Sequence, residues 1–78
     1  MKDLLLFIAE SLIGSSENIE VEVNEGDRFI DCVIRVPEEH IGKLIGRNGK
    51  IATAIRTVAR ASARKSDKHV NVKIDKIA

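Results

Sequence analysis

A short polar segment bounded by glycines stands where the chain could bind an anion. It reads Gly46-Arg47-Asn48-Gly49-Lys50, with apolar residues on both sides. Glycine tolerates positive φ and lets another backbone approach, because it has no Cβ. If a helix starts beside the second glycine, its N–H groups and dipole favour a phosphate, and Arg47 and Lys50 add full positive charges. The segment is therefore a candidate phosphate-binding loop.

Two common nucleotide-binding loops do not match this spacing. A P-loop needs a glycine where Leu44 stands, and Ser or Thr where Ile51 stands. The dinucleotide fingerprint GxGxxG also fails, because Gly42, Gly46 and Gly49 are spaced differently and follow a predicted helix. A tight turn between two helices needs glycine as well, so a purely structural role of the segment stays open.

Hydrophobic periodicity predicts the elements that position this loop. Apolar residues recur at helical spacing in some segments and alternate with polar residues in others. The predicted elements are a helix over 2–13, strands over 19–23 and 30–36, a helix over 37–45, a helix from Gly49 to about Lys65, and a strand over 70–75. Strands joined by a helical crossover normally pair in parallel. The order αββααβ predicts an α+β two-layer sandwich, with three helices on one face of a three-stranded mixed sheet.

The helix after the loop carries two kinds of side chain. Its predicted packing arc consists of Ile51, Ile55, Val58, Ala59 and Ser62. Another arc is cationic and consists of Lys50, Arg56, Arg60 and Arg64. This stripe, together with Lys65, either extends a phosphate track or only solvates the helix, and both interpretations stay open.

Charge is divided unevenly along the chain. Residues 1–40 contain three basic and ten acidic side chains, and residues 41–78 contain ten basic and two acidic ones, so their net charges are −7 and +8. The second half, which contains the loop, is the candidate for a polyanionic partner. With 44% hydrophobic and 32% charged residues, the chain has the composition of one globular domain over residues 1–78.

Several other classes of function are not expected. Cys32 is the only cysteine, so no intrachain disulfide can form, and His40 and His69 cannot complete a zinc site around it. No Ser, Cys or carboxylate is spaced with these histidines as in a catalytic triad. We therefore expect no metal, no cofactor and no enzyme. The apolar run over 4–9 ends at Glu10, too short to span a membrane, and a reducing cytoplasm is the expected location.

These residues resemble a KH domain of the type II, bacterial topology. The segment IGRNGKIATAIR ends a short predicted helix and opens a longer one within αββααβ. The resemblance covers nearly the whole chain and is closest to the small stand-alone KhpA family of RNA-binding proteins. KH modules clamp about four single-stranded nucleotides with a GXXG loop. The resemblance implies a non-catalytic protein that binds single-stranded RNA, with Gly46 and Gly49 as the loop glycines and Arg47 and Asn48 as the variable pair.

The resemblance also implies an apolar groove for the bases. One wall would consist of Ile41, Gly42, Leu44, Ile45 and Ile51. The opposite wall would be a sheet edge, around residues 70–73. One departure is Ala52, where many members carry Ile or Val. The apolar residues of the expected groove are equally well explained as core. The residues expected to bind RNA are Ile41, Gly42, Lys43, Leu44, Ile45, Gly46, Arg47, Asn48, Gly49, Lys50 and Ile51.

The partners implied by the resemblance are single-stranded RNA and other KH proteins. Phe7 and Phe29 are the only aromatic residues, which argues against modules that stack bases on aromatic platforms. Members of the family are expected to form homodimers, or heterodimers with a larger KH-containing protein linked to cell elongation and division, and to act as RNA chaperones or post-transcriptional regulators. The alternative is a protein-interaction or dimerisation module in which the glycine loop is only a turn.

Overall fold

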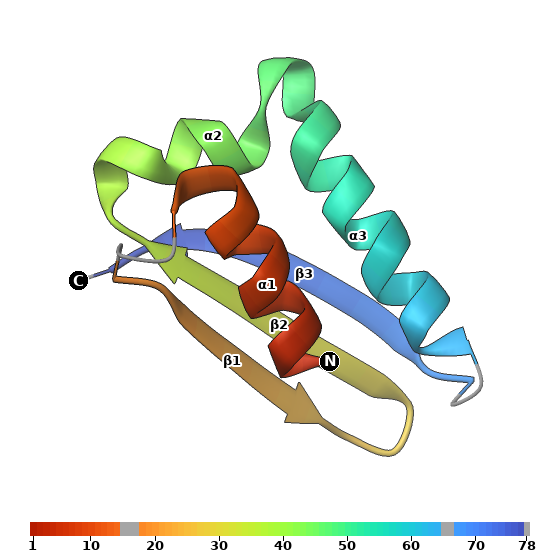
Figure 1. The fold of residues 1–78 in the computed structure, drawn as a ribbon. Helices are drawn as coiled ribbons and strands as arrows, with labels where there is room; N and C mark the ends of the chain where they lie inside the picture. The colour runs from red at the N-terminus through yellow and green to blue at the C-terminus, as the bar shows by residue number, and fades with distance from the viewer. Residues whose placement is uncertain (15–17, 65–66, 78) are drawn as a thin grey trace.

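The helices and strands follow the predicted order along the chain. The computed structural model describes residues 1–14, 18–64 and 67–77 (Figure 1). Its elements are α1 (Lys2–Ile13), β1 (Glu20–Glu25), β2 (Phe29–Val36), the 3-10 turn η1 (Glu38–His40), α2 (Ile41–Ile45), the 3-10 turn η2 (Arg47–Gly49), α3 (Lys50–Ser62) and β3 (His69–Lys76). The order αββααβ is thus confirmed, with two 3-10 turns beside α2. None of the described helices has the length and apolar character that crossing a bilayer requires.

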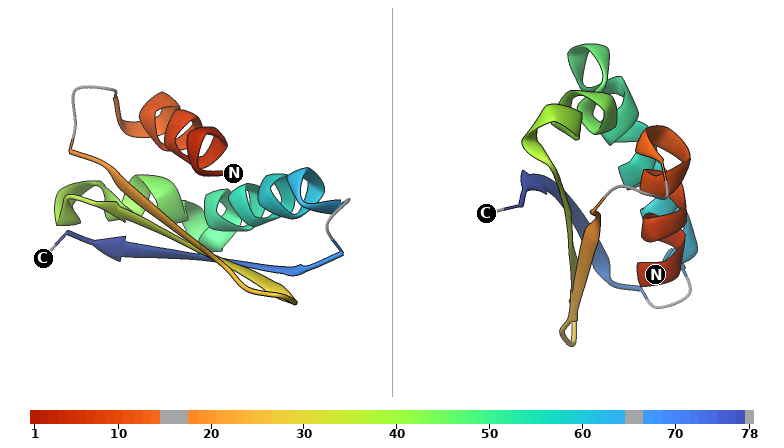
Figure 2. Two further views of the ribbon diagram at one scale, coloured as in Figure 1. Left: turned by 90° about the horizontal axis from the view of Figure 1, so that it is seen from below. Right: turned by 60° about the vertical axis from the view of Figure 1, so that its left-hand side comes forward.

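The three strands form one mixed sheet in the order β1-β2-β3. β1 and β2 pair antiparallel, and β2 and β3 pair in parallel, with Cys32 opposite both Val23 and Val72. The helices cover one face of this sheet, as Figure 2 shows from two sides. β3 is therefore an edge strand, and it lies beside α3.

The core lies between the sheet and the helices. Alternate residues of the strands face inward because successive side chains of a strand point to opposite faces. The buried residues are Val21, Ile30, Cys32, Ile34, Val36, Val70 and Val72 from the sheet, and Leu5, Ala9, Ile13, Leu44, Ala52, Ile55, Ala59 and Ala63 from the helical layer. The alanines of α3 let its backbone lie close to the sheet.

The helices differ from the prediction in detail. The segment predicted as one helix over 37–45 is divided into η1 and α2, with Pro37 preceding η1 rather than lying in it. α3 ends at Ser62, and the predicted end at Lys65 lies outside the described residues. Val58 is 41% exposed and Ser62 is exposed, so the predicted packing arc was wrong at these two positions. The residues of α3 that are buried are Ala52, Ile55 and Ala59.

Candidate nucleic-acid interface

The glycine loop lies at the surface between α2 and α3. Gly46 and Gly49 have φ angles of 72° and 74°, and Asn48 between them has a φ of 57°. Arg47 and Asn48 are exposed, and neither glycine is buried. A ligand in solvent can therefore reach the backbone of this segment.

The two glycines are required for different reasons. Gly46 has a ψ of 178°, and this combination with positive φ is essentially restricted to glycine. A Cβ on Gly46 would also lie 2.6 Å from Cγ1 of Ile51. Gly49 has a ψ of 14° in the left-handed region, and a Cβ there would have no contact within 4 Å beyond its chain neighbours. Gly46 fixes the turn against α3, and Gly49 keeps the start of α3 accessible.

Hydrogen bonds inside the loop maintain its shape. The Gly46 N–H donates to the Gly42 carbonyl at 2.8 Å, and the Gly49 N–H donates to the Gly46 carbonyl at 3.3 Å. The Lys50 N–H donates to the Arg47 carbonyl. The N–H groups of the two residues between the glycines take no part in these bonds.

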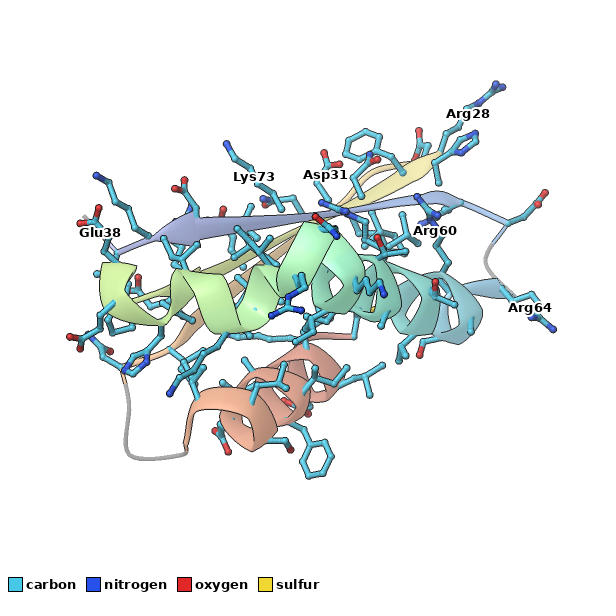
Figure 3. The ribbon with its side chains drawn as sticks, turned by 90° about the horizontal axis from the view of Figure 1, so that it is seen from above. Arg28, Asp31, Glu38, Arg60, Arg64 and Lys73 are labelled. Carbon is cyan, nitrogen blue, oxygen red and sulfur yellow. The ribbon has the colours of Figure 1, made fainter. Side chains whose placement is uncertain are left out.

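A groove between α3 and β3 begins at the glycine loop. Figure 3 shows β3 alongside the helical layer, with Lys73 on this strand. The groove is lined by Ile45, Gly49, Ala52 and Arg56 on the helical side and by Val72, Lys73 and Ile74 on the strand side. The second wall is thus formed by residues 72–74, and it overlaps the expected 70–73 only in part.

β3 presents backbone hydrogen-bonding groups to this groove. The His69 N–H donates to the Arg28 carbonyl and the Ile77 N–H to the Val36 carbonyl, each at 3.0 Å, so the odd-numbered residues of β3 pair with β2. Alternate residues of an edge strand direct their N–H and C=O groups away from the sheet. The backbone groups of Val70, Val72 and Ile74 therefore point away from the sheet, and of these residues Val72 and Ile74 line the groove.

The four residues of the cationic stripe of α3 do not lie on one surface of the protein. Arg56 is half-buried, lies in the groove, and donates from Nε to the Val72 carbonyl oxygen at 3.3 Å. Lys50 lies on the side of α3 that faces α1. Arg60 and Arg64 are exposed near the other end of α3 (Figure 3). The groove thus contains a single member of the stripe, and it is already hydrogen bonded to β3.

The comparison with known proteins identifies the family. The family model for the KhpA/KhpB KH domain matches residues 2–74. The chain belongs to the KhpA/KhpB KH-domain family. It is 43% identical over 74 residues to the RNA-binding protein KhpA of Clostridium perfringens, covering 95% of this chain and 99% of that protein. It is 38% identical over 72 residues to the RNA-binding protein KhpA of Borreliella burgdorferi, covering 92% and 88%. No solved structure matches the chain.

Membership in the KhpA/KhpB family identifies the segment Gly46 to Gly49 as the GXXG loop of a KH domain. A KH domain binds nucleic acid with a GXXG loop and does not catalyse a reaction. The prediction that this chain is not an enzyme agrees with the family. In the described residues, no three His, Cys, Asp or Glu side chains are grouped so that they could hold a metal ion.

The structure separates the residues that were expected to wall the groove. Ile45 is 40% exposed and lines it. Leu44 is 0% exposed and lies in the core, so the expectation that it lines the wall was wrong. Adjacent residues of a helix point about 100° apart, so Leu44 can point inward while Ile45 points to the groove. Ile41 is half-buried and packs against the core, and Ile51 lines a hollow on the α1 side of α3.

The remaining expected residues of α2, Gly42 and Lys43, are exposed on that helix. Three groove residues were missed from the expected site: Ala52, Arg56 and Ile74. Ala52 and Arg56 follow the second loop glycine by three and seven residues, which places them on one face of a helix. This spacing was a signal in the sequence that could have found them.

A second surface, apolar in character, lies between α1 and α3. Within it Phe7 is 68% exposed, Leu12 38% and Val58 41%. The hollow at its centre is lined by Phe7, Ile8, Ser11, Leu12, Lys50, Ile51, Ala54, Ile55 and Val58, and we call this surface the α1–α3 face. It uses the opposite side of α3 from the side on which Ala52 and Arg56 line the groove.

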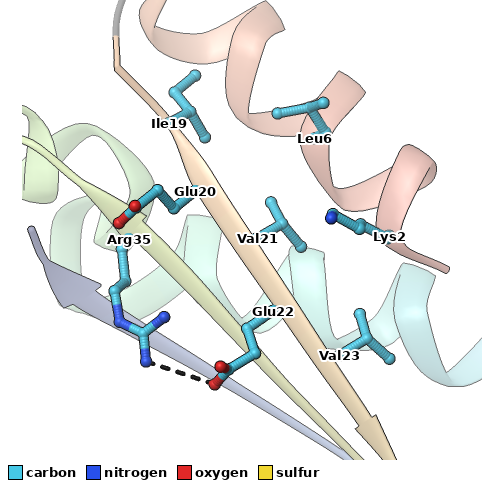
Figure 4. A pocket seen from close by; sticks show the side chains of 8 residues that line it. All are labelled: Lys2, Leu6, Ile19, Glu20, Val21, Glu22, Val23 and Arg35. Atoms are coloured by element: carbon cyan, nitrogen blue, oxygen red, sulfur yellow. Dashed lines mark hydrogen bonds and ion pairs between the residues drawn. The ribbon is translucent and has the colours of Figure 1, made fainter.

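A third hollow, between α1 and β1, has no link to the loop. Its polar side chains include Arg35 and Glu22, which form an ion pair at 3.4 Å (Figure 4). At the end of β1, the Glu25 carboxylate pairs with Lys68, which directly precedes β3 and lowers the pKa of that carboxyl through a hydrogen bond and its charge. Glu22 and Glu25 thus form their ion pairs with residues that do not line the groove.

Proposed function

We propose that the protein binds single-stranded RNA in the groove between α3 and β3, with the sugar–phosphate backbone held at the glycine loop. The observation that carries this proposal is the exposed loop at one end of that groove. The relatives named RNA-binding protein KhpA support RNA as the ligand. We infer a cytoplasmic location, because an RNA ligand is compatible with it.

The phosphates would be bound by the loop. The N–H groups of Arg47 and Asn48 are the loop donors that the internal hydrogen bonds leave out, and the start of α3 adds its dipole. The Arg47 side chain supplies positive charge, and Lys50, the first residue of α3, adds its charge from the side of that helix that faces α1. Lys43 and Gly42 lie exposed on α2, next to the loop, and complete this basic end of the groove.

The bases would lie against the apolar side chains of the groove and the free edge of β3. Ile45 and Ala52 offer apolar contact, and the backbone of residues 72 and 74 offers donors and acceptors. Such a groove needs no aromatic platform, which agrees with the absence of Tyr and Trp from the chain.

The test is the double substitution Arg47→Asp and Asn48→Asp. Both residues are exposed, so the fold should survive. Affinity for a labelled single-stranded RNA should fall at least about tenfold, because hydrogen bonds to charged groups are lost and repulsion replaces them. The matched control is Arg28→Asp with Asn24→Asp, which changes charge equally on the exposed β1–β2 hairpin. Equal affinity of the loop variant and this control would refute the proposal.

The alternative, a protein-interaction module, is favoured by a different observation, the α1–α3 face. We propose that this face mediates self-association, or association with a larger KH-containing partner, in addition to RNA binding. A groove for about four nucleotides binds weakly alone, and pairing two grooves raises the effective concentration. In this form the protein would act as an RNA chaperone or post-transcriptional regulator with its partner, in control of cell elongation and division and hence of cell shape and cell wall organisation.

Sedimentation analysis tests the proposed association. The wild-type protein should sediment as a dimer, and Phe7→Glu with Val58→Glu should sediment as a monomer, because two charges would be buried at the contact. Phe29→Glu is the control, since Phe29 is 43% exposed but lies on β2. A wild-type protein that stays monomeric at tens of micromolar would contradict self-association through this face.

A further inference from the structure

The outer edge of β1 is a second free strand edge, on the opposite side of the sheet from β3. Within the described residues, β1 pairs with β2 alone. The Gly26 N–H donates to the Phe29 carbonyl at 2.8 Å, and hydrogen-bonded pairs alternate along an antiparallel ladder, so the even-numbered residues of β1 pair with β2. The odd-numbered residues Val21, Val23 and Glu25 therefore direct their N–H and C=O groups away from the sheet. Such an unpaired row is a template for an added strand.

The two sides of this edge differ in character. Figure 4 shows Val21 and Val23 pointing toward α1, and Glu20 and Glu22 on the other side of the strand. The hollow between α1 and β1 is apolar at its floor, where its lining side chains are Leu6, Ile19, Val21 and Val23. An apolar side chain beside the edge would therefore find contacts only on the α1 side.

Negative charge marks the other side of the edge. Glu20 and Glu22 lie there with Arg35 of β2, which forms its ion pair with Glu22 at 3.4 Å. Two exposed carboxylates thus share one guanidinium, and the row keeps a net negative charge. Lys2 comes from α1 on the apolar side of the edge, so it is not part of this row.

A strand added to β1 would present its side chains alternately to these two sides. In an antiparallel pair, the residues opposite the two valines turn their backbone groups to β1 and their side chains into the hollow, and the alternate residues lie beside the two glutamates. Apolar residues suit the first set, and Lys or Arg suit the second. A second copy of β1 does not fit, because pairing Val21 with Val23 of the copy would place the two Glu22 side chains directly opposite each other.

We propose that the free edge of β1 is a docking site for an extended basic segment of a partner protein, in which apolar residues alternate with Lys or Arg and which adds a strand to the sheet. The site lies on the far edge of the sheet from β3, and it does not depend on the proposed RNA binding.

Synthetic heptapeptides added to the ¹⁵N-labelled protein test the proposal by NMR. Acetyl-KVKVKVK-amide should shift the amide resonances of Val21, Val23 and Glu25 most and leave those of the glycine loop unmoved. The same peptide with N-methylated valines should not bind, because the donors that face β1 are gone, whereas N-methylated lysines should be tolerated. The peptide KKVVVKK has the same composition without the alternation and should bind at least about fivefold more weakly, and EVEVEVE should not bind.

Substitutions in the protein test the charge of the site. Glu20→Gln with Glu22→Gln keeps the backbone of the edge and should weaken binding of acetyl-KVKVKVK-amide about fivefold, on the scale of exposed ion pairs. The matched control is Thr53→Lys with Ala61→Lys, which adds the same charge at exposed positions of α3. This control should stay within about twofold of the wild-type affinity, because salt screens distant exposed charges.

Failure of acetyl-KVKVKVK-amide to bind, equal binding of the two N-methylated peptides, or equal binding of the basic and acidic peptides would overturn the proposal. Amide shifts away from β1, or an unchanged affinity in Glu20→Gln with Glu22→Gln, would also overturn it. The RNA affinity of this variant should equal that of the wild-type protein. Loss of the docking site and loss of the proposed RNA binding are therefore separate results.

Discussion

Alanine substitutions at the two loop glycines should have unequal effects on stability. Gly46 combines a φ of 72° with a ψ of 178°, and a Cβ there would lie 2.6 Å from the Ile51 side chain. The restricted backbone region costs about 1–3 kcal/mol and overpacking a further 1–3, so Gly46→Ala should lower the free energy of unfolding by about 2–6 kcal/mol. Gly49 is in the left-handed region with open space around it, and Gly49→Ala should lower it by only about 1–2 kcal/mol.

Urea unfolding followed by circular dichroism at 222 nm measures these differences, since the chain has no Trp or Tyr for fluorescence. Gly42→Ala is the control. Gly42 lies within α2 with no atom near its missing Cβ, so alanine should stabilise the protein by about 0.5–1 kcal/mol. Gly49→Asn should also be tolerated, because asparagine adopts the left-handed region. Equal losses for Gly46→Ala and Gly49→Ala would refute the distinction between a packed and an open glycine.

Further predictions concern burial and charge. Leu44→Ala should lower the free energy of unfolding, measured with urea, by about 2–5 kcal/mol, because Leu44 is 0% exposed. Ile45 is 40% exposed, so Ile45→Ala should mainly weaken RNA binding, measured by fluorescence anisotropy. Cys32 is 1% exposed and burial raises its pKa, so its thiol should react with a disulfide reagent such as DTNB only after unfolding; rapid reaction of the native protein would contradict this. Arg60→Gln with Arg64→Gln should leave the salt dependence of RNA affinity unchanged, because both residues lie outside the groove. If the slope of log affinity against log salt concentration became smaller by about 0.7 per residue, the two arginines would contact phosphates and the prediction would be wrong.

The sequence was sufficient for the topology because each element has a strong local signal. Alternation over β2 and β3, helical spacing over α1, and glycines at the bend between α2 and α3 all depend on near neighbours in the chain. The parallel pairing of β2 and β3 follows from the length of the helical crossover between them.

The walls of the groove were harder to predict because they depend on how helices rotate against the sheet. α2 has only five residues, too few for periodicity to show that Leu44 points inward and Ile45 outward. Arg56 shares the charge pattern of Arg60 and Arg64, and only the tertiary position of β3 places an acceptor, the Val72 carbonyl, beside it. Contacts between distant segments carry this information, and a single sequence does not show them.

The most direct test of the account is an NMR titration of the ¹⁵N-labelled protein with a short single-stranded RNA. Amide shifts should concentrate at the loop and the groove, over residues 45–52 and 70–74, with the N–H groups of Arg47 and Asn48 among the largest. β1, on the far edge of the sheet, should change little. Shifts concentrated on β1 or on the α1–α3 face, with the loop amides unmoved, would contradict the central claim that the glycine loop holds the RNA backbone.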